Sequence, residues 1–164
     1  MSTFVSVGNS SQAFPRLLEK VAELAPHLPQ PVTVQCGNSP FMSSTCAVRP
    51  FLGMNEFAKS VADAKLVVLH AGAGSIIHAA RAGKIPVVMP RRAKYGEHVD
   101  DHQVDLALEL ENSGKVIVAW EPEDLDAAVA RALARTPVTA GDEQGSVMAA
   151  LVRECLEAYA SGRR

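Results

Sequence analysis

Short apolar runs alternate with segments of helical periodicity along most of the chain, and this alternation constrains the fold more than any other feature. The run LVVL in 65–69 carries no polar residue, which is typical of a strand covered on both faces. The expected strands are 3–8, 31–37, 47–52, 65–69, 85–90 and 115–120. The expected helices are 12–25, 54–64, 75–82, 102–114 and 121–135. Strands that alternate with helices predict an α/β fold with a doubly wound parallel sheet.

Length and composition indicate one domain. The 164 residues, 48% of them hydrophobic, suffice for one compact domain with a core but not for two large ones. We therefore expect residues 1–164 to form a single domain, in which a loop at 136–145 precedes a last helix at 146–160. That helix carries an apolar stripe of Met148, Leu151, Val152, Cys155, Leu156 and Tyr159. The stripe packs either on the domain's own sheet or against a partner.

Charge, cysteines and hydropathy exclude several classes of protein. A net charge of -2 leaves no dominant basic face, so nucleic acid is not an expected partner. Cys36, Cys46 and Cys155 lie far apart without a CxxC pair, as is typical of reduced thiols. The amino terminus lacks the pattern of a signal peptide, and no run approaches ~18 uninterrupted apolar residues. We expect a cytoplasmic protein with no direct membrane insertion.

Two glycine-containing turns fall at the carboxyl ends of predicted strands, where ligands bind in such sheets. The first is GNSSQ, 8–12, and the second is HAGAGS, 70–75. Gly72 and Gly74 would let a phosphate approach the N–H groups of the following helix, and Ser75 could add a hydroxyl donor. The glycines could instead serve only a tight strand–helix turn. Because two such turns lie at one edge, we favour an anion site.

Familiar nucleotide motifs do not fit these turns. GAGSII lacks the third glycine of the dinucleotide fingerprint, and no acidic residue ends the next strand. A P-loop is excluded because the chain has no GK[ST]. A Rossmann-type oxidoreductase is therefore a weak alternative, and no cofactor is expected.

The stretch LHAGAGSIIHAARAGKIPVVMPRRAKYGEHVDDHQ, 69–103, resembles the donor-binding signature of the glycosyltransferase family 28 C-terminal domain. VSVGNSS near the amino terminus, together with Gln35 and Gly37 as Q-x-G, matches the same family in order. RPFLGMNEFAKSVADAKLVV resembles the segment in which family members hold uracil. The resemblance extends over about 3–134.

The resemblance implies the Rossmann-like carboxyl-terminal half of a GT-B glycosyltransferase. The chain would be the donor-binding subunit of a heteromeric glycosyltransferase, active with a partner that supplies the acceptor half. Its substrate would be a UDP-sugar, and the sugar would pass to a lipid-linked acceptor in polysaccharide biosynthesis. A membrane-anchored partner would hold the chain at the inner membrane. The motif is most similar to bacterial exopolysaccharide subunits and is similar to the soluble subunit of the dolichol-linked N-acetylglucosaminyltransferase. A nucleotide-binding or regulatory module without catalysis of its own is the alternative.

The resemblance also implies a set of donor-binding residues. The residues near the diphosphate are Gly8, Asn9, Ser10, Gly72, Ala73, Gly74 and Ser75, and His70 is a further donor-binding residue. Those at the uracil are Phe51, Leu52 and Met54, and those facing the donor sugar are His102 and Gln103. His78 stands where the family commonly has a glutamate that contacts the ribose hydroxyls. A histidine can exchange one such hydrogen bond but offers no bidentate carboxylate.

Other polar groups leave alternatives open. His98 and His102 lie four residues apart, as in a helical metal pair, but no third ligand is apparent. We therefore favour a polar helix start with a capping acid and expect no metal. The segment Arg91, Arg92 and Lys94 is either a solvated loop or a contact for a phosphate or carboxylate. An inverting transfer needs a general base, which we expect from the acceptor half, so the catalytic residue is unassigned.

Overall fold

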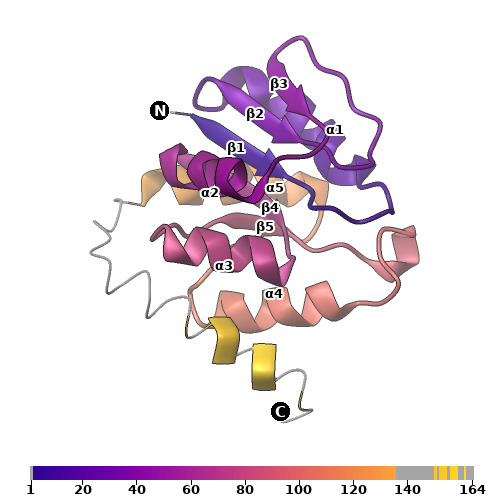
Figure 1. The fold of residues 1–164 in the computed structure, drawn as a ribbon, viewed down its shortest axis with the longest axis vertical. Coiled ribbons are helices and arrows are strands. Elements are labelled where there is room, and N and C mark those ends of the chain that lie inside the picture. Colours follow the sequence, from indigo (N-terminus) through magenta and orange to yellow (C-terminus); the bar gives the residue numbers. More distant parts are fainter. Residues whose placement is uncertain (1, 136–149, 151, 155, 159–160, 162–164) are drawn as a thin grey trace.

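A computed structural model describes residues 2–135, 150, 152–154, 156–158 and 161 (Figure 1). Within them, six strands form one parallel sheet in the order β3-β2-β1-β4-β5-β6. The strands are β1 (Thr3–Ser6), β2 (Val32–Gln35), β3 (Cys46–Arg49), β4 (Leu66–His70), β5 (Val87–Met89) and β6 (Ile117–Val118). The helices are α1 (Pro15–Leu24), α2 (Met54–Asp63), α3 (Ala73–Arg81), α4 (His102–Asn112) and α5 (Leu125–Ala134), with 3-10 turns η1 (Ala25–His27), η2 (Ala93–Tyr95) and η3 (Pro122–Asp124). The predicted doubly wound parallel sheet is confirmed.

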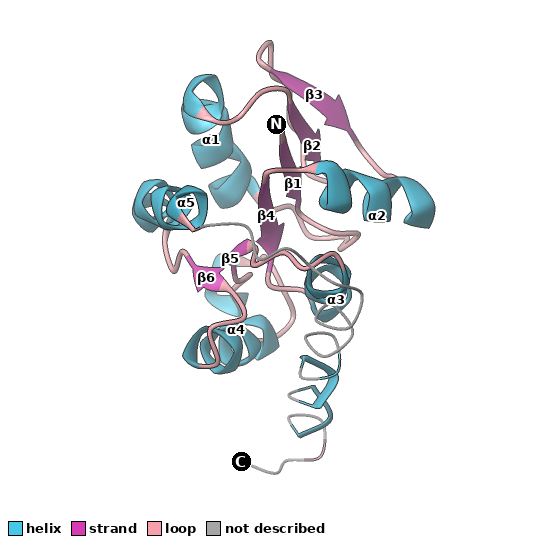
Figure 2. Cartoon of the chain, turned by 90° about the vertical axis from the view of Figure 1, so that its left-hand side faces the viewer, coloured by secondary structure: helices cyan, strands magenta, loops and turns pink. Residues whose placement is uncertain are grey.

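The core consists of two apolar layers, one on each face of the sheet. Alternate residues of a strand point to opposite faces, so Leu66 and Val68 join one layer while Val67 and Leu69 join the other. Helices α1 and α5 cover the first face, and α2, α3 and α4 cover the second. Figure 2 shows α1 and α5 on one side of the sheet and α2 and α3 on the other. Burial on both faces explains why β4 begins with the continuous apolar run LVVL.

The strand order places a topological switch point between β1 and β4. The chain moves outward from β1 through β2 to β3, then returns to β4 beside β1 and moves outward again through β5 to β6. The register aligns Ser6 with Leu69, so β4 extends one residue, His70, beyond the end of β1. The loops that follow them therefore diverge to opposite faces and leave a crevice at the carboxyl edge, where α/β sheets bind ligands.

Element boundaries differ from the expected ones for local reasons. The predicted strand 47–52 ends at Arg49, because Pro50 has no N–H to continue the ladder. The predicted helix 75–82 begins two residues earlier, because Gly72 adopts the extended conformation of an N-cap. It ends as expected near Gly83, which has a φ of 67° and donates its N–H to the carbonyl of Ala80.

The loop predicted at 136–145 lies outside the described residues, and the last helix predicted at 146–160 lies partly outside them. Residues 150, 152–154 and 156–158 are helical. Val152 is fully buried, and Leu156 packs against the same layer as α2, α3 and α4. These two members of the apolar stripe contact the domain itself; the other four lie outside the described residues. No helix in the described part of the chain has the length and apolar character needed to cross a membrane.

Candidate functional site

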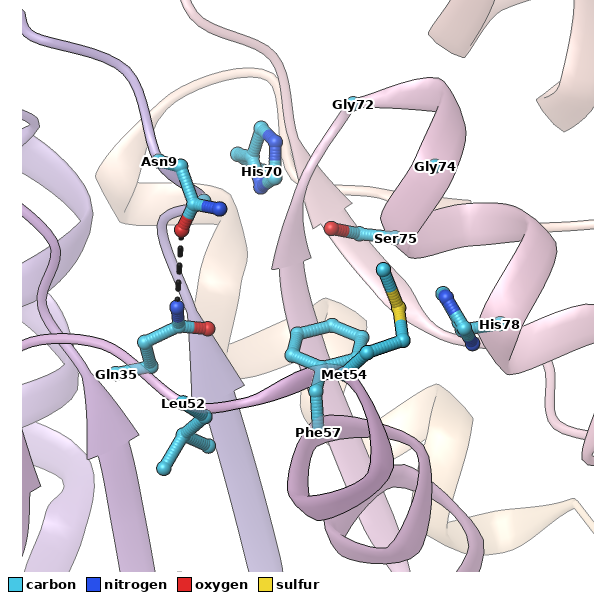
Figure 3. Close-up of a pocket in the computed structure, with 11 residues that line it drawn as sticks. Asn9, Gln35, Leu52, Met54, Phe57, His70, Gly72, Gly74, Ser75 and His78 are labelled. Carbon is cyan, nitrogen blue, oxygen red and sulfur yellow. Dashed lines mark hydrogen bonds between the residues drawn. The ribbon is translucent and has the colours of Figure 1, made fainter.

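A cavity of about 270 Å³ opens at the switch point between β1 and β4. Its walls come from the loop after β1, the end of β2, the start of α2, the end of β4 and the first turns of α3 (Figure 3). The lining residues are Gly8, Asn9, Gln35, Leu52, Met54, Phe57, His70, Gly72, Gly74, Ser75 and His78. None of these described residues carries a carboxylate, an ammonium or a guanidinium group. Any charged ligand here would therefore be held by backbone groups, by hydroxyl and amide side chains, and by the imidazoles of His70 and His78.

His70 fills the space between the two glycine turns. A Cβ on Gly8 would lie 2.5 Å from Cε1 of the His70 ring, and a Cβ on Gly72 would clash with its Nε2. Gly8 also has a φ of 75°, a conformation that side-chain-bearing residues rarely adopt. Gly72 was expected to let a phosphate approach, but the space that its missing side chain leaves is occupied by His70. Gly74 differs, because nothing lies within 4 Å of a Cβ placed on it.

Burial keeps the His70 imidazole neutral. It lowers the pKa of His70 to about 4, and the positive charge of Arg91 acts in the same direction. The backbone of Ser6 opposes this shift, yet Nδ1 of His70 has no partner with hydrogen-bond geometry among the described residues. A neutral imidazole has one N–H donor and one acceptor nitrogen, so His70 can still donate one hydrogen bond.

The amino terminus of α3 forms a wall of the cavity that is rich in hydrogen-bond donors. The first backbone bond of this helix runs from the N–H of Ile76 to the carbonyl of Gly72 at 3.1 Å. The preceding N–H groups have no intrahelical partner, and the helix dipole adds partial positive charge beside them. Ser75 contributes a hydroxyl, and Gly74 leaves the approach open. This wall suits an anionic, oxygen-rich group such as a phosphate.

The opposite wall is apolar and aromatic. Leu52, Met54 and Phe57 line it, and the Phe57 ring meets His78 edge to face with 5.5 Å between ring centroids. Phe57 also packs edge to face on Phe4 of β1 at 5.3 Å, which ties this wall to the core. Flat apolar surfaces with one polar ring are suited to a nucleobase and its ribose.

Nine of the fourteen residues expected at a donor site line this cavity. The remaining five, Ser10, Phe51, Ala73, His102 and Gln103, do not. Phe51 is 51% exposed beside the cavity. Gln103 accepts the backbone N–H of Arg91 through Oε1 at 3.1 Å, so its carbonyl oxygen supports the loop after β5. The His102 side chain is 64% exposed, with Nδ1 3.4 Å from Asp100.

Arg91 has neither of the roles expected for it. Its side chain is 1% exposed, so the loop is not solvated there. The guanidinium donates to the backbone carbonyls of Val7 at 2.7 Å, Gln12 at 2.9 Å and Glu97 at 3.0 Å. It also stacks over Phe14, with 4.8 Å to the ring centroid. Arg91 thus ties the loop after β5 to the loop after β1. Burial lowers its pKa to about 10, which still leaves it charged at neutral pH.

Arg92 also has internal partners. Its guanidinium pairs with Glu121 at 2.9 Å and donates to the carbonyl of Trp120 at 3.1 Å. Lys94 lies over the ring of Tyr95, 4.5 Å from the centroid. None of the three basic side chains of this loop lines the cavity.

The histidines at the start of α4 surround a capping acid. Asp100 accepts the backbone N–H of His102 at 3.1 Å and lies 2.9 Å from Nδ1 of His98. The N–H of His102 is the main reason that the pKa of Asp100 lies below its usual value. Among the described residues, no group of three or more His, Cys, Asp or Glu side chains is placed to hold a metal.

Two lining residues were not among the expected site residues. Gln35 belongs to the Q-x-G motif but was not assigned a role, and Phe57 lies within the predicted helix 54–64 but was not assigned to the site. Their positions depend on which strand ends beside which helix, which periodicity does not give. The signal for Gln35 was a polar residue at the end of a buried strand, since its side chain is only 2% exposed.

Comparisons with solved structures agree with this architecture. CalG4, the calicheamicin glycosyltransferase, superposes with a TM-score of 0.64 at 19% identity, over 93% of this chain and 38% of that one. MurG of Acinetobacter baumannii superposes with a TM-score of 0.57 at 22% identity, over 93% of this chain and 45% of that one. At these identities the likeness shows the fold alone. The chain spans less than half the length of either structure.

The sequence comparisons identify the family. The UDP-N-acetylglucosamine transferase subunit ALG13 of Yarrowia lipolytica is 32% identical over 71 residues, which are 43% of this chain and 34% of that protein. The chain thus matches about a third of its relative's length. Residues 2–146 match the glycosyltransferase family 28 C-terminal domain, which covers both glycine turns, the whole cavity and all six strands. The chain therefore belongs to the glycosyltransferase family 28 C-terminal domain family.

Proposed function

We propose that this chain is the donor-binding subunit of a heteromeric glycosyltransferase. It binds a UDP-sugar, and a membrane-anchored acceptor-binding subunit completes the active site at the inner membrane. The sugar passes to a lipid-linked acceptor in polysaccharide biosynthesis. The observation that supports this proposal most is the cavity at the switch point, which joins a wall of hydrogen-bond donors to an apolar wall. A nucleoside diphosphate has a diphosphate that matches the first wall and a flat base that matches the second.

The two walls suggest how the donor lies. The diphosphate faces the amino terminus of α3 and the loop after β1, where N–H and hydroxyl groups converge. The base and ribose lie against Leu52, Phe57 and His78. The sugar then extends toward the open carboxyl edge, where a second protein can present the acceptor.

The chemistry that this chain supplies is stabilisation of the leaving group. In the transfer, an acceptor oxygen forms a bond to the anomeric carbon, and the bond from that carbon to the diphosphate breaks with its electron pair going to the phosphate. Negative charge therefore grows beside α3, where unpaired N–H groups and the helix dipole stabilise it. The acceptor's proton must go to a general base. No carboxylate lines the cavity among the described residues, so we place that base in the partner subunit.

The proposal agrees with the names of related proteins. The Yarrowia lipolytica relative is named as a subunit of a UDP-N-acetylglucosamine transferase. This chain matches the carboxyl-terminal domain family of glycosyltransferases and spans less than half of the superposed enzymes. In our proposal the partner subunit supplies the acceptor half.

A ligand panel on the purified chain tests the donor site. UDP and UDP-sugars should raise the unfolding temperature, because a ligand at 100 times its dissociation constant adds about 2.7 kcal/mol to the stability of the folded state. Nicotinamide dinucleotides are the control and should have no effect. Stabilisation by the dinucleotides and not by UDP compounds would contradict the proposal.

A further inference from the structure

A chain of hydrogen bonds runs beneath the cavity and ends at Asn9. The backbone N–H of Gly8 donates to Oγ of Ser6 at 3.1 Å, and the Ser6 hydroxyl donates to Oε1 of Gln35 at 2.8 Å. Nε2 of Gln35 then donates to Oδ1 of Asn9 at 3.1 Å (Figure 3). Ser6 is fully buried and Gln35 is 2% exposed, so water does not compete at the two inner positions.

The direction of this chain follows from the burial of its members. The oxygen of Ser6 accepts the backbone N–H of Gly8, and with its proton directed to Gln35 the buried hydroxyl has a partner for both its donor and its acceptor function. The amide of Gln35 then presents its oxygen to Ser6 and its nitrogen to Asn9. Asn9 in turn must present its oxygen to Gln35, because two amide nitrogens would otherwise face each other. The relay does not use the amide nitrogen of Asn9, and Figure 3 shows this nitrogen on the side of the cavity where His70 lies.

We propose that Gln35 is a positioning residue that fixes the side chain of Asn9 as a hydrogen-bond donor toward the cavity, where it binds a phosphoryl oxygen of a nucleoside diphosphate. The inference rests on the proposed function. Phosphoryl oxygens accept hydrogen bonds and do not donate them, so an unrestrained asparagine would present the wrong atom in part of the molecules. The buried relay removes that alternative and makes Asn9 match the donors at the amino terminus of α3.

Calorimetric titration of UDP into variants of the purified chain tests the relay. Gln35→Met keeps the length of the side chain but removes both hydrogen bonds, and Asn9→Ala removes the proposed donor. Each should weaken UDP binding about tenfold, as expected for loss of an oriented hydrogen bond to a charged group. The double variant should bind no more weakly than either single variant. Gln30→Met is the matched control at the opposite end of β2, where its amide contacts only backbone carbonyls, and its affinity should be unchanged.

Gln35→Glu distinguishes positioning from mere packing. A carboxylate can only accept, so Asn9 would turn over and present Oδ1 to the phosphate, and affinity should fall by roughly thirtyfold or more. In the Asn9→Ala background the same substitution should have a much smaller effect. An equal loss in both backgrounds would show direct charge repulsion and would overturn the relay.

A spectroscopic measurement on the unaltered chain does not depend on whether variants fold. The side-chain amide signal of Asn9 in a ¹⁵N spectrum, assigned by its absence from Asn9→Ala, should shift on addition of UDP or of inorganic pyrophosphate. If UDP binds and that signal stays in place, or if Gln35→Met binds UDP as tightly as the original chain, the inference is wrong and the proposed function stands. If UDP compounds do not bind at all, the proposed function fails, and the pyrophosphate titration decides the role of Asn9 by itself.

Discussion

At the scale of single residues, the glycines of the two turns serve different purposes. Gly8 and Gly72 make room for the ring of His70, whereas Gly74 leaves open space above the amino terminus of α3. A glycine-rich turn read from sequence does not distinguish a side chain of the same protein from a ligand as the occupant. Only the position of Gly74 now supports close approach of a phosphate.

Gly74→Val should abolish UDP binding without disturbing the fold. A Cβ at this position has open space around it, so the branched side chain would extend into the space proposed for the phosphate. We expect affinity to fall by at least ~100-fold, or about 2.7 kcal/mol, in a calorimetric titration. Gly53→Val is the matched control, because Gly53 also has open space around it and does not line the cavity. Unchanged titration of Gly74→Val would refute the donor site.

His78→Glu should bind UDP as tightly as the original chain or up to ~10-fold more tightly. The carboxylate can accept hydrogen bonds from two ribose hydroxyls, and a good hydrogen bond to a charged group outweighs the lost contact with Phe57. His78→Ala serves as the comparison that removes the ring without adding an acceptor. Weaker binding by a folded His78→Glu protein would mean that this position does something other than contact the ribose.

His70 should make the folded state less stable as the pH falls from about 6.5 toward 4. In that window the unfolded chain takes up a proton at this imidazole and the buried ring does not, so the free energy of unfolding decreases by up to about 3 kcal/mol. Below the pKa of His70 in both the folded and the unfolded chain, the free energy of unfolding decreases no further through this group. Denaturant titrations at several pH values should show a smaller decrease for His70→Asn, whatever its absolute stability. Equal pH dependence in the two proteins would contradict the assignment.

At the scale of elements, Arg91 links the loops that follow β1 and β5. Arg91→Met should destabilise the fold by roughly 3 kcal/mol, because several buried carbonyls would lose a charged donor at once. Arg49→Met on β3 is the control, since Arg49 is exposed and donates only to the neighbouring Val48 carbonyl. Chemical denaturation measures the free energy of unfolding of both variants. Similar stabilities for the two variants would show that Arg91 contributes little to the tie between the loops.

Sequence periodicity predicted the order and type of the elements because the central strands β1 and β4 are buried on both faces and the helices bury one face each. It could not predict the occupants of the carboxyl edge, where loops from distant parts of the chain meet. Arg91 looked like a surface or ligand residue because arginine is seldom fully buried. Its partners are backbone carbonyls of 7, 12 and 97, and no composition or spacing marks them. Gln35 was overlooked because its partners, Ser6 and Asn9, also come from a distant part of the chain.

At the scale of the whole molecule, the chain should not transfer sugar by itself. Its cavity has no lining carboxylate among the described residues, and it opens at the carboxyl edge, where an acceptor half would close it. Labelled UDP-sugar and lipid-linked acceptor should give product only after a membrane-anchored acceptor-binding protein is added. Heat-denatured partner is the control. Transfer by the purified chain alone would disprove the two-subunit arrangement.

The ring of His70 also restricts the order in which this family member can evolve. Gly72 has a φ of −83°, so its backbone would accept alanine, and only the neighbouring imidazole prevents it. A side chain at 72 therefore requires the imidazole of His70 to move aside or to be replaced by a smaller side chain. Gly8 gains no such freedom, because its φ of 75° disfavours a side chain even in an empty site. The residues permitted at 72 thus depend on the residue at 70, whereas the backbone conformation of Gly8 requires glycine whatever residue stands at 70.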